Sequence, residues 1–138
     1  MAGNKFDEAI EVLTNFMREM YEWDIKYYDK LVDNFEKYKE EAKKELTRIY
    51  GKYLINKTRK QGREVSGRAS SPPEYDPELE KVERYEEIAS NKIIIYTKQG
   101  SGFMFNCRYT LKSRNNIWFI DKKETYDSYE KKWCIENF

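Results

Sequence analysis

Asp121 is the residue best placed to do chemistry in this sequence. It follows the apolar run of residues 117–120, so a strand would carry its carboxylate out of a hydrophobic interior, where burial can tune a general acid or base. Tyr85 or Tyr109 could supply the second polar group of such a pocket. Two lysines follow Asp121 directly, however, and an ion pair at the end of a strand is the simpler interpretation.

The absence of histidine from the sequence weighs against catalysis. It removes the commonest general base, the commonest metal ligand and every nucleophile that histidine activates. The two closely spaced glycines, Gly100 and Gly102, lie between expected strands, where a hairpin turn explains them better than a phosphate-binding loop. We therefore expect no catalytic residues, no metal site and no cofactor.

The two cysteines, Cys107 and Cys134, do not have the spacing of metal ligands. They could form a disulfide or remain reduced, packed thiols, and the lack of an export signal in residues 1–16 favours the thiols. No apolar run approaches the roughly 20 residues that a membrane helix needs. We expect a cytoplasmic protein without a membrane partner.

Aromatic residues make up 16% of the chain, and 12 of them are tyrosines. Tyrosine, tryptophan and arginine dominate protein interfaces because they combine a large rigid surface with a polar end. The same side chains could instead fill the core, and we expect Tyr96 and Arg108 to be the most exposed. The predicted partner-binding residues are Tyr85, Tyr96, Arg108, Trp118, Lys122 and Lys123.

The chain carries 26 basic and 25 acidic residues, and this balance argues against a general nucleic-acid binder. A local basic cluster lies in a loop rich in Gly, Ser and Pro, and it is called the basic loop below: Lys57, Arg59, Lys60, Arg63 and Arg68. It could meet an acidic partner or nucleic acid, or it could be a solvated linker. It lacks the interleaved aromatic residues on which single-stranded nucleic acids stack.

Two helices are predicted for the first third of the chain. Apolar residues recur at three- and four-residue steps in two stretches, residues 6–20 and 35–53. Asp33 and Glu36 resemble a capping box, so we place the turn between the helices within residues 29–34.

The last part of the chain is predicted to form strands at residues 93–97, 103–111 and 117–124. Residues 79–89 suit either a strand or a helix, and the turn-like residues 90–91 before the next strand favour a strand. Residues 126–138 are expected to form a short helix with Tyr126, Tyr129 and Trp133 on one side. We divide a single domain, residues 1–138, into a helical half (1–56), a loop (57–77) and a half of antiparallel strands with a short C-terminal segment (78–138). The expected fold is α+β, with the N-terminal helices packed on one face of a strongly curved antiparallel sheet.

The strand half also resembles a known protein family, through an ordered series of segments at matching spacing. These segments are Pro72-Pro73-Glu74-Tyr75-Asp76-Pro77, Glu80-Lys81-Val82-Glu83, Ile95-Tyr96-Thr97-Lys98-Gln99, Arg108-Tyr109-Thr110-Leu111-Lys112, Trp118-Phe119-Ile120-Asp121-Lys122-Lys123-Glu124 and Trp133. The N-terminal segment Asn15-Phe16-Met17-Arg18-Glu19-Met20, with Trp23, agrees more loosely. The chain resembles the immunity proteins of bacterial polymorphic toxin systems that adopt a nuclear-transport-factor-2-like fold.

This resemblance implies a cone-like arrangement of helices and a strongly bent sheet. It also implies that the protein binds a cognate toxin domain in the cytoplasm of the producing cell and neutralises it in a stoichiometric inhibitory complex. It carries over no catalytic residue. The alternative function is a small-molecule-binding protein, or an isomerase- or hydratase-like enzyme, that uses the interior of the cone. A nucleic-acid accessory protein that acts through the basic loop is a third hypothesis.

Overall fold

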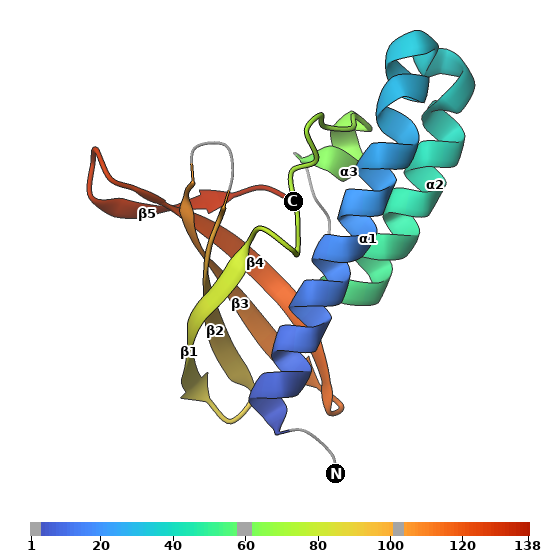
Figure 1. Cartoon of the computed structure of the whole chain (residues 1–138). Coiled ribbons are helices and arrows are strands. Elements are labelled where there is room, and N and C mark those ends of the chain that lie inside the picture. Colours follow the sequence, from blue (N-terminus) through green and yellow to red (C-terminus); the bar gives the residue numbers. More distant parts are fainter. Residues whose placement is uncertain (1–3, 58–61, 101–103) are drawn as a thin grey trace.

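The computed structural model describes residues 4–57, 62–100 and 104–138. Two long helices lie side by side on one face of a curled, five-stranded antiparallel sheet (Figure 1). In chain order, the elements are α1 (Lys5–Asp33), α2 (Phe35–Tyr53), α3 (Arg63–Ser66), β1 (Lys81–Ala89), β2 (Lys92–Lys98), β3 (Asn106–Arg114), β4 (Ile117–Asp127) and β5 (Lys132–Glu136). The predicted α+β class, with helices on one face of a curved antiparallel sheet, is confirmed.

One residue, Asn34, separates α1 from α2. Its backbone N–H donates to the Lys30 carbonyl oxygen at 2.9 Å, and its side-chain oxygen accepts from the Lys37 N–H at 3.2 Å. The turn lies within the predicted range, but Asn34 rather than Asp33 is the cap, because its side chain reaches the N–H three residues later. None of the helices in the described ranges combines the length with the apolar character that crossing a membrane requires.

The five strands pair as a meander in chain order. The predicted strands at 79–89, 93–97 and 117–124 are confirmed as β1, β2 and β4, although β4 continues to Asp127. Residues 115–116, both with positive φ, make the tight turn between β3 and β4. A register shift in the β3–β4 ladder marks a bulge at Asp121.

The predicted C-terminal helix is wrong. Tyr126 lies in β4 and Trp133 in β5, and these two residues pair across the strands. The Asp127 carboxylate accepts from the backbone N–H groups of Tyr129 and Glu130 at 2.9 and 3.1 Å, which closes a tight turn. The spacing of the aromatic residues suited a helix, but this local turn folds the segment back as a hairpin.

The predicted third strand began too early. β3 starts at Asn106, because Met104 adopts a positive φ of 55° and interrupts the extended backbone. Phe105, expected on the apolar face, is 42% exposed. Phe103 lies outside the described residues. The later members of the apolar face are buried as predicted: Cys107, Tyr109 and Leu111.

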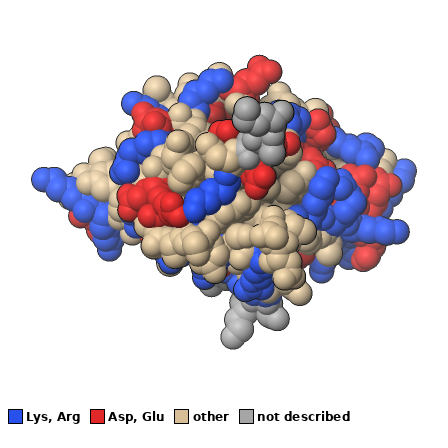
Figure 2. Space-filling model, turned by 90° about the horizontal axis from the view of Figure 1, so that it is seen from below, with Lys and Arg blue, Asp and Glu red and all other residues tan. Residues whose placement is uncertain are grey.

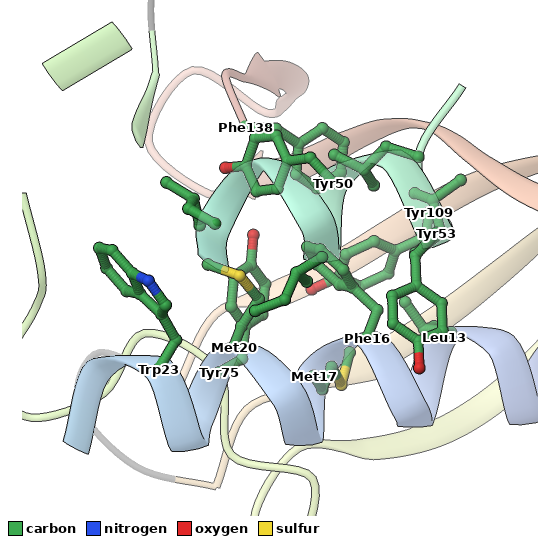
Figure 3. Close-up of a cluster of buried hydrophobic side chains, with 14 of the residues drawn as sticks. Leu13, Phe16, Met17, Met20, Trp23, Tyr50, Tyr53, Tyr75, Tyr109 and Phe138 are labelled. Atoms are coloured by element: carbon green, nitrogen blue, oxygen red, sulfur yellow. The ribbon is translucent and has the colours of Figure 1, made fainter. Parts of the chain in front are cut away.

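The core lies between the helices and the face of the sheet that they cover, and Phe16 of α1 is at its centre (Figure 3). The Phe16 ring meets the rings of Tyr75 and Phe138 edge-on, at centroid distances of 5.3 and 5.7 Å. The buried Trp23 donates its indole N–H to a carbonyl oxygen of α2 at 2.9 Å. Large aromatic side chains therefore supply the buried area that a chain with few aliphatic residues needs.

Asp24, fully buried in α1, anchors the segment between α2 and β1. Its two carboxylate oxygens accept from the Arg63 guanidinium and from the backbone N–H groups of Ser70 and Glu74, the last two at 2.9 and 3.2 Å. The Glu74 carboxylate pairs in turn with Arg63 at 3.0 Å and with the buried Lys123 at 3.4 Å. The segment is tied to both layers of the fold.

The described part of the basic loop does not form one basic patch. Arg63 is bound to the buried carboxylate, so the interpretation of this residue as part of a solvated linker is wrong. Arg68 lies over an aromatic ring of α2 at 5.5 Å, and Lys57 pairs with a carboxylate of β4 at 3.6 Å. Arg59 and Lys60 lie outside the described residues.

Candidate functional site

The two faces of the sheet differ in character. Successive residues of a strand point to opposite faces, and the pairing register assigns them. The inner face, toward the helices, carries fully buried side chains such as Ile93 and Ile95. The opposite face, called the outer face, turns away from both long helices in Figure 1. Its central side chains are Arg84, Glu86, Ile94, Tyr96, Arg108, Thr110, Lys112, Phe119, Lys122, Glu124, Tyr126, Trp133 and Ile135.

Aromatic rings and guanidinium groups stack on the outer face. The guanidinium carbon of Arg84 lies 3.6 Å from the Tyr96 ring centroid, and that of Arg108 lies 4.4 Å from the Trp133 ring. The Tyr96 and Trp133 rings are 6.0 Å apart. Their strands are separated by two others, which on a flat sheet would hold the rings about 14 Å apart. The two rings therefore lean toward each other. These four side chains are called the aromatic–arginine cluster.

Arg108 and Glu124 form a bidentate ion pair within the outer face. The Nε–Oε1 and Nη2–Oε2 distances are both 2.9 Å. The hydrogen bonds from Arg108 lower the pKa of Glu124, and the same bonds raise the pKa of Arg108. Because a planar bidentate pair holds the guanidinium in one orientation, the indole ring of Trp133 stacked on it is preorganised.

Three of the six predicted partner-binding residues lie together on the outer face: Tyr96, Arg108 and Lys122. The expectation that Tyr96 and Arg108 are the most exposed is wrong, because neighbouring side chains of the cluster leave both half-buried, whereas Tyr85 is 48% exposed. The Lys122 side chain is 41% exposed, and its ammonium lies 3.8 Å from the Glu124 carboxylate.

The other three predicted residues belong to the inner face. Trp118 is 5% exposed and is part of the core. Lys123 is 4% exposed, and its ammonium lies over a buried tyrosine ring at 4.6 Å. Tyr85 is half-exposed at the edge of the sheet, where it stacks on an aromatic ring of α1 at 4.4 Å. None of the three adds surface to the aromatic–arginine cluster.

The bulge at Asp121 decides which residues of β4 reach the outer face. It inserts one residue between the pairs Leu111–Ile120 and Thr110–Lys122, so the alternation reverses after Ile120. Lys122 and Glu124 would otherwise share the inner face with Ile120. Sequence reasoning missed Arg84, Glu124 and Trp133. Once β3 and β4 are paired, the opposite charges of Arg108 and Glu124 indicate that the two side chains form an ion pair.

The alternative pocket built around Asp121 is not assembled. The Asp121 carboxylate lies 3.2 Å from the Lys112 ammonium and 3.6 Å from that of Lys57. Burial raises the pKa of this carboxyl, but the two lysines outweigh it and hold the pKa below its ordinary value. The interpretation of Asp121 as an ion-paired residue is confirmed, but its partners are not the lysines that follow it, and it lies within β4 rather than at the end of the strand. Tyr109 instead donates its hydroxyl to Glu80 at 2.9 Å.

A cleft of about 610 Å³ opens at the mouth of the curled sheet, beside the segment that precedes β1. Three of its charged side chains have partners within the fold: Lys123 pairs with Glu74, and the Glu80 carboxylate accepts from the hydroxyl groups of Thr97 and Tyr109. Within the described ranges, no three Cys, Asp or Glu side chains converge as a metal site. Glu74, Glu80 and Lys123 are therefore held by contacts within the fold.

Cys107 and Cys134 are both free thiols that lie on either side of Thr125 in the sheet. Two strand spacings hold them about 9–10 Å apart, beyond the roughly 7 Å that a disulfide spans. Burial raises the pKa of the Cys107 thiol to about 11. The geometry favours the reduced thiols over the disulfide.

Comparisons with known proteins identify a matching family and a relative of the chain. A family model described as NTF2 fold immunity protein matches residues 8–137. A protein named Immunity protein RhsIA, from Dickeya dadantii (strain 3937), is 38% identical over 134 residues, which cover 96% of this chain and 98% of that protein. No solved structure matches the chain.

Proposed function

Because the chain belongs to the NTF2-fold immunity proteins and functions in toxin neutralisation, we propose that it holds its cognate toxin against the outer face of its sheet. The observation that carries this proposal is the aromatic–arginine cluster: Arg84, Tyr96, Arg108 and Trp133. These are the residue types that dominate binding energy at protein interfaces. They lie on a sheet face that no described helix covers.

The geometry of the cluster supports this role. Trp133 and Tyr96 have few rotatable bonds, and their guanidinium neighbours restrict them further. Binding then costs little side-chain entropy, because the contact groups are already ordered. The exposed Ile135, and Tyr126 with its ring 5.3 Å from that of Trp133, extend the apolar area around the cluster.

We propose that neutralisation needs no catalysis by this chain. The residues of the alternative pocket support this view, since Asp121 is held by lysines and Tyr109 by Glu80. Titration of a fixed amount of toxin should give a linear loss of toxin activity that ends at a 1:1 ratio, and separation of the complex should restore that activity. Complete inactivation by a small fraction of an equivalent would contradict the proposal.

The contact surface is tested by removing two rings of the cluster with Tyr96→Ala/Trp133→Ala. We expect a loss of toxin affinity of at least about 30-fold, which corresponds to about 2 kcal/mol, and a loss of growth rescue on co-expression with the toxin. The matched control, Tyr85→Ala/Tyr28→Ala, removes two partly exposed tyrosines away from the outer face. If the first variant unfolds cooperatively and still neutralises the toxin like the unchanged protein, the outer face is not the contact surface.

We also propose that the complex forms in the cytoplasm. Cys107 and Cys134 support this compartment, because both are free thiols, as expected of proteins in reducing surroundings. Cell fractionation should recover the protein with cytoplasmic markers. Recovery in the periplasmic fraction would contradict the assignment.

A further inference from the structure

Lysines face each other directly across the strands of the outer face. Lys81 of β1 pairs with Lys98 of β2, and Lys92 of β2 pairs with Lys112 of β3. Like charges at directly opposed positions destabilise a sheet. Asp121 compensates Lys112 at 3.2 Å, but the other three lysines have no carboxylate partner among the described residues. Folding alone does not account for this arrangement.

The charge excess extends along the whole outer face. The register assigns eight basic side chains to it: Lys81, Arg84, Lys92, Lys98, Arg108, Lys112, Arg114 and Lys122. Among the described strand residues, the register assigns two carboxylates to it, Glu86 and Glu124, while Glu83 and Asp121 stand at bulges. The complete chain is nearly neutral, with 26 basic and 25 acidic residues. Figure 2, a view from below, shows both signs mixed around an uncharged strip. By register, basic side chains outnumber carboxylates on the outer face, although the whole chain is balanced in charge.

Thr110, near the centre of this face, has an unsatisfied hydroxyl. The residue is 1% exposed, and its Oγ1 is buried without a hydrogen-bond partner among the described residues. Its neighbours across the strands are Ile94 and Lys122. A buried hydroxyl without a partner costs free energy, so the stability of the fold alone does not account for this group either.

From these features we infer that the toxin presents an acidic surface to the outer face. This inference rests on the proposed function and adds the chemistry of the partner. The aromatic–arginine cluster supplies short-range affinity, while the surrounding lysines attract carboxylates before contact is made. Such steering accelerates association and weakens as salt screens the charges.

The inference also indicates which part of the toxin is covered. A cleft that binds nucleic acid or another polyanion carries an excess of basic side chains. The lysine-rich outer face would repel such a cleft. The docked region is therefore an acidic part of the toxin and not a phosphate-binding cleft.

The test measures how fast the protein associates with its purified cognate toxin domain, inactivated by a substitution in the active site of the toxin. Lys81→Glu/Lys98→Glu should associate at least about tenfold more slowly at low ionic strength, with a flatter dependence on salt. The matched control, Lys43→Glu/Lys44→Glu, makes the same change of charge at exposed positions of α2. It should associate within about twofold of the unchanged protein.

A single substitution separates binding from folding. Lys98→Glu replaces the repulsion opposite Lys81 with an attraction, so the thermal midpoint should stay the same or rise. Association with the toxin should nevertheless become slower. A role in folding alone would not slow association while stability is kept.

The outcomes distinguish this inference from the proposed function. If the lysine variants associate normally or faster, or if the α2 control slows equally, the acidic partner surface is excluded. Loss of binding in Tyr96→Ala/Trp133→Ala would then still support the outer face as the contact surface. If Tyr96→Ala/Trp133→Ala also binds the toxin normally, the outer face is not the contact surface.

Discussion

The two faces of the sheet are built from alternate residues of the same strands, yet they serve different purposes. On β2, Ile95 is fully buried beneath the helices, whereas its neighbour Tyr96 belongs to the aromatic–arginine cluster. On β3, Tyr109 is fully buried, whereas Arg108 is only half-buried and stacks on the outer face. Of two adjacent residues in one strand, one therefore stabilises the fold and the other is available for binding. The effect of a substitution depends on which face the side chain occupies.

Charged groups show the same division. Asp24, Arg63, Glu74 and Lys123 form one connected network on the inner side, where each charge has an opposite partner. On the outer face, Arg108 and Lys112 have carboxylate partners, but Lys81, Lys92 and Lys98 have none among the described residues. A buried charge must be paired to be tolerated, whereas a solvated charge need not be. The unpaired charges are the ones that a partner can use.

The largest effect on stability is expected from Asp24→Ala. This change leaves the Arg63 guanidinium, whose side chain is 12% exposed, without its carboxylate and frees two backbone N–H groups. Breaking a buried ion pair costs about 3–5 kcal/mol of unfolding free energy, which urea denaturation would measure. Asp29→Ala, an exposed position on α1, is the control and should cost less than about 0.5 kcal/mol. Equal stability of the two variants would contradict the view that the buried ion pairs stabilise the fold more than exposed charges do.

The next largest effects come from neighbours on opposite faces. Ile95→Ala should lower the free energy of unfolding by about 2–5 kcal/mol, because it opens a cavity in the core, and leave the toxin affinity of the folded protein nearly unchanged. Tyr96→Ala should cost less stability but weaken toxin affinity by about tenfold or more. Chemical denaturation and titration calorimetry measure the two quantities. An equal loss of toxin affinity in Ile95→Ala and Tyr96→Ala would contradict the claim that only the outer face binds the toxin.

Low pH should reduce the stability contributed by carboxyl groups on both sides of the sheet. Only the carboxyl group on the outer face, Glu124, should also affect toxin binding. The pKa of Glu74 is lowered by Lys123 and Arg63 against the opposing effect of burial, and that of Glu124 is lowered mainly by hydrogen bonds from Arg108. A carboxyl with a lowered folded pKa stabilises the fold above its ordinary value of 4.5, and this stability is lost as pH falls through the folded value.

Both Glu74→Gln and Glu124→Gln should therefore flatten the loss of stability below that pH, as measured by thermal unfolding across a pH series. At neutral pH, Glu124→Gln alone should weaken toxin binding, since it loosens the guanidinium under Trp133. A loss of binding in Glu74→Gln at neutral pH would contradict the separation of the faces.

The smallest effect is expected from Gly51→Ala. Gly51 lies inside α2, and nothing lies within 4 Å of the position that a Cβ would take. Alanine should stabilise the helix by about 0.5–1 kcal/mol, with no change in toxin affinity. Thermal unfolding and binding together check both parts. A stabilised variant with altered affinity would show that stability and binding are not independent.

The helices and most strands followed from the sequence, because apolar periodicity reports directly which face is buried. The sequence pattern did not predict which residues of β4 lie on which face, because the bulge at Asp121 moves Lys122 to the outer face and Lys123 to the inner face. Trp133 was missed for a related reason, since the turn at Asp127 overrides a spacing that also suits a helix. Residue type indicated a binding surface, but only the register shows which of the predicted residues share a face.

The most direct test of the outer face uses a photo-crosslinking phenylalanine analogue placed at position 96 or at position 85. Tyr96 and Tyr85 stand on neighbouring strands and point to opposite faces of the sheet. Irradiation of the complex should link position 96, but not position 85, to the inactivated toxin domain. Crosslinking from position 85 with none from position 96 would contradict the account.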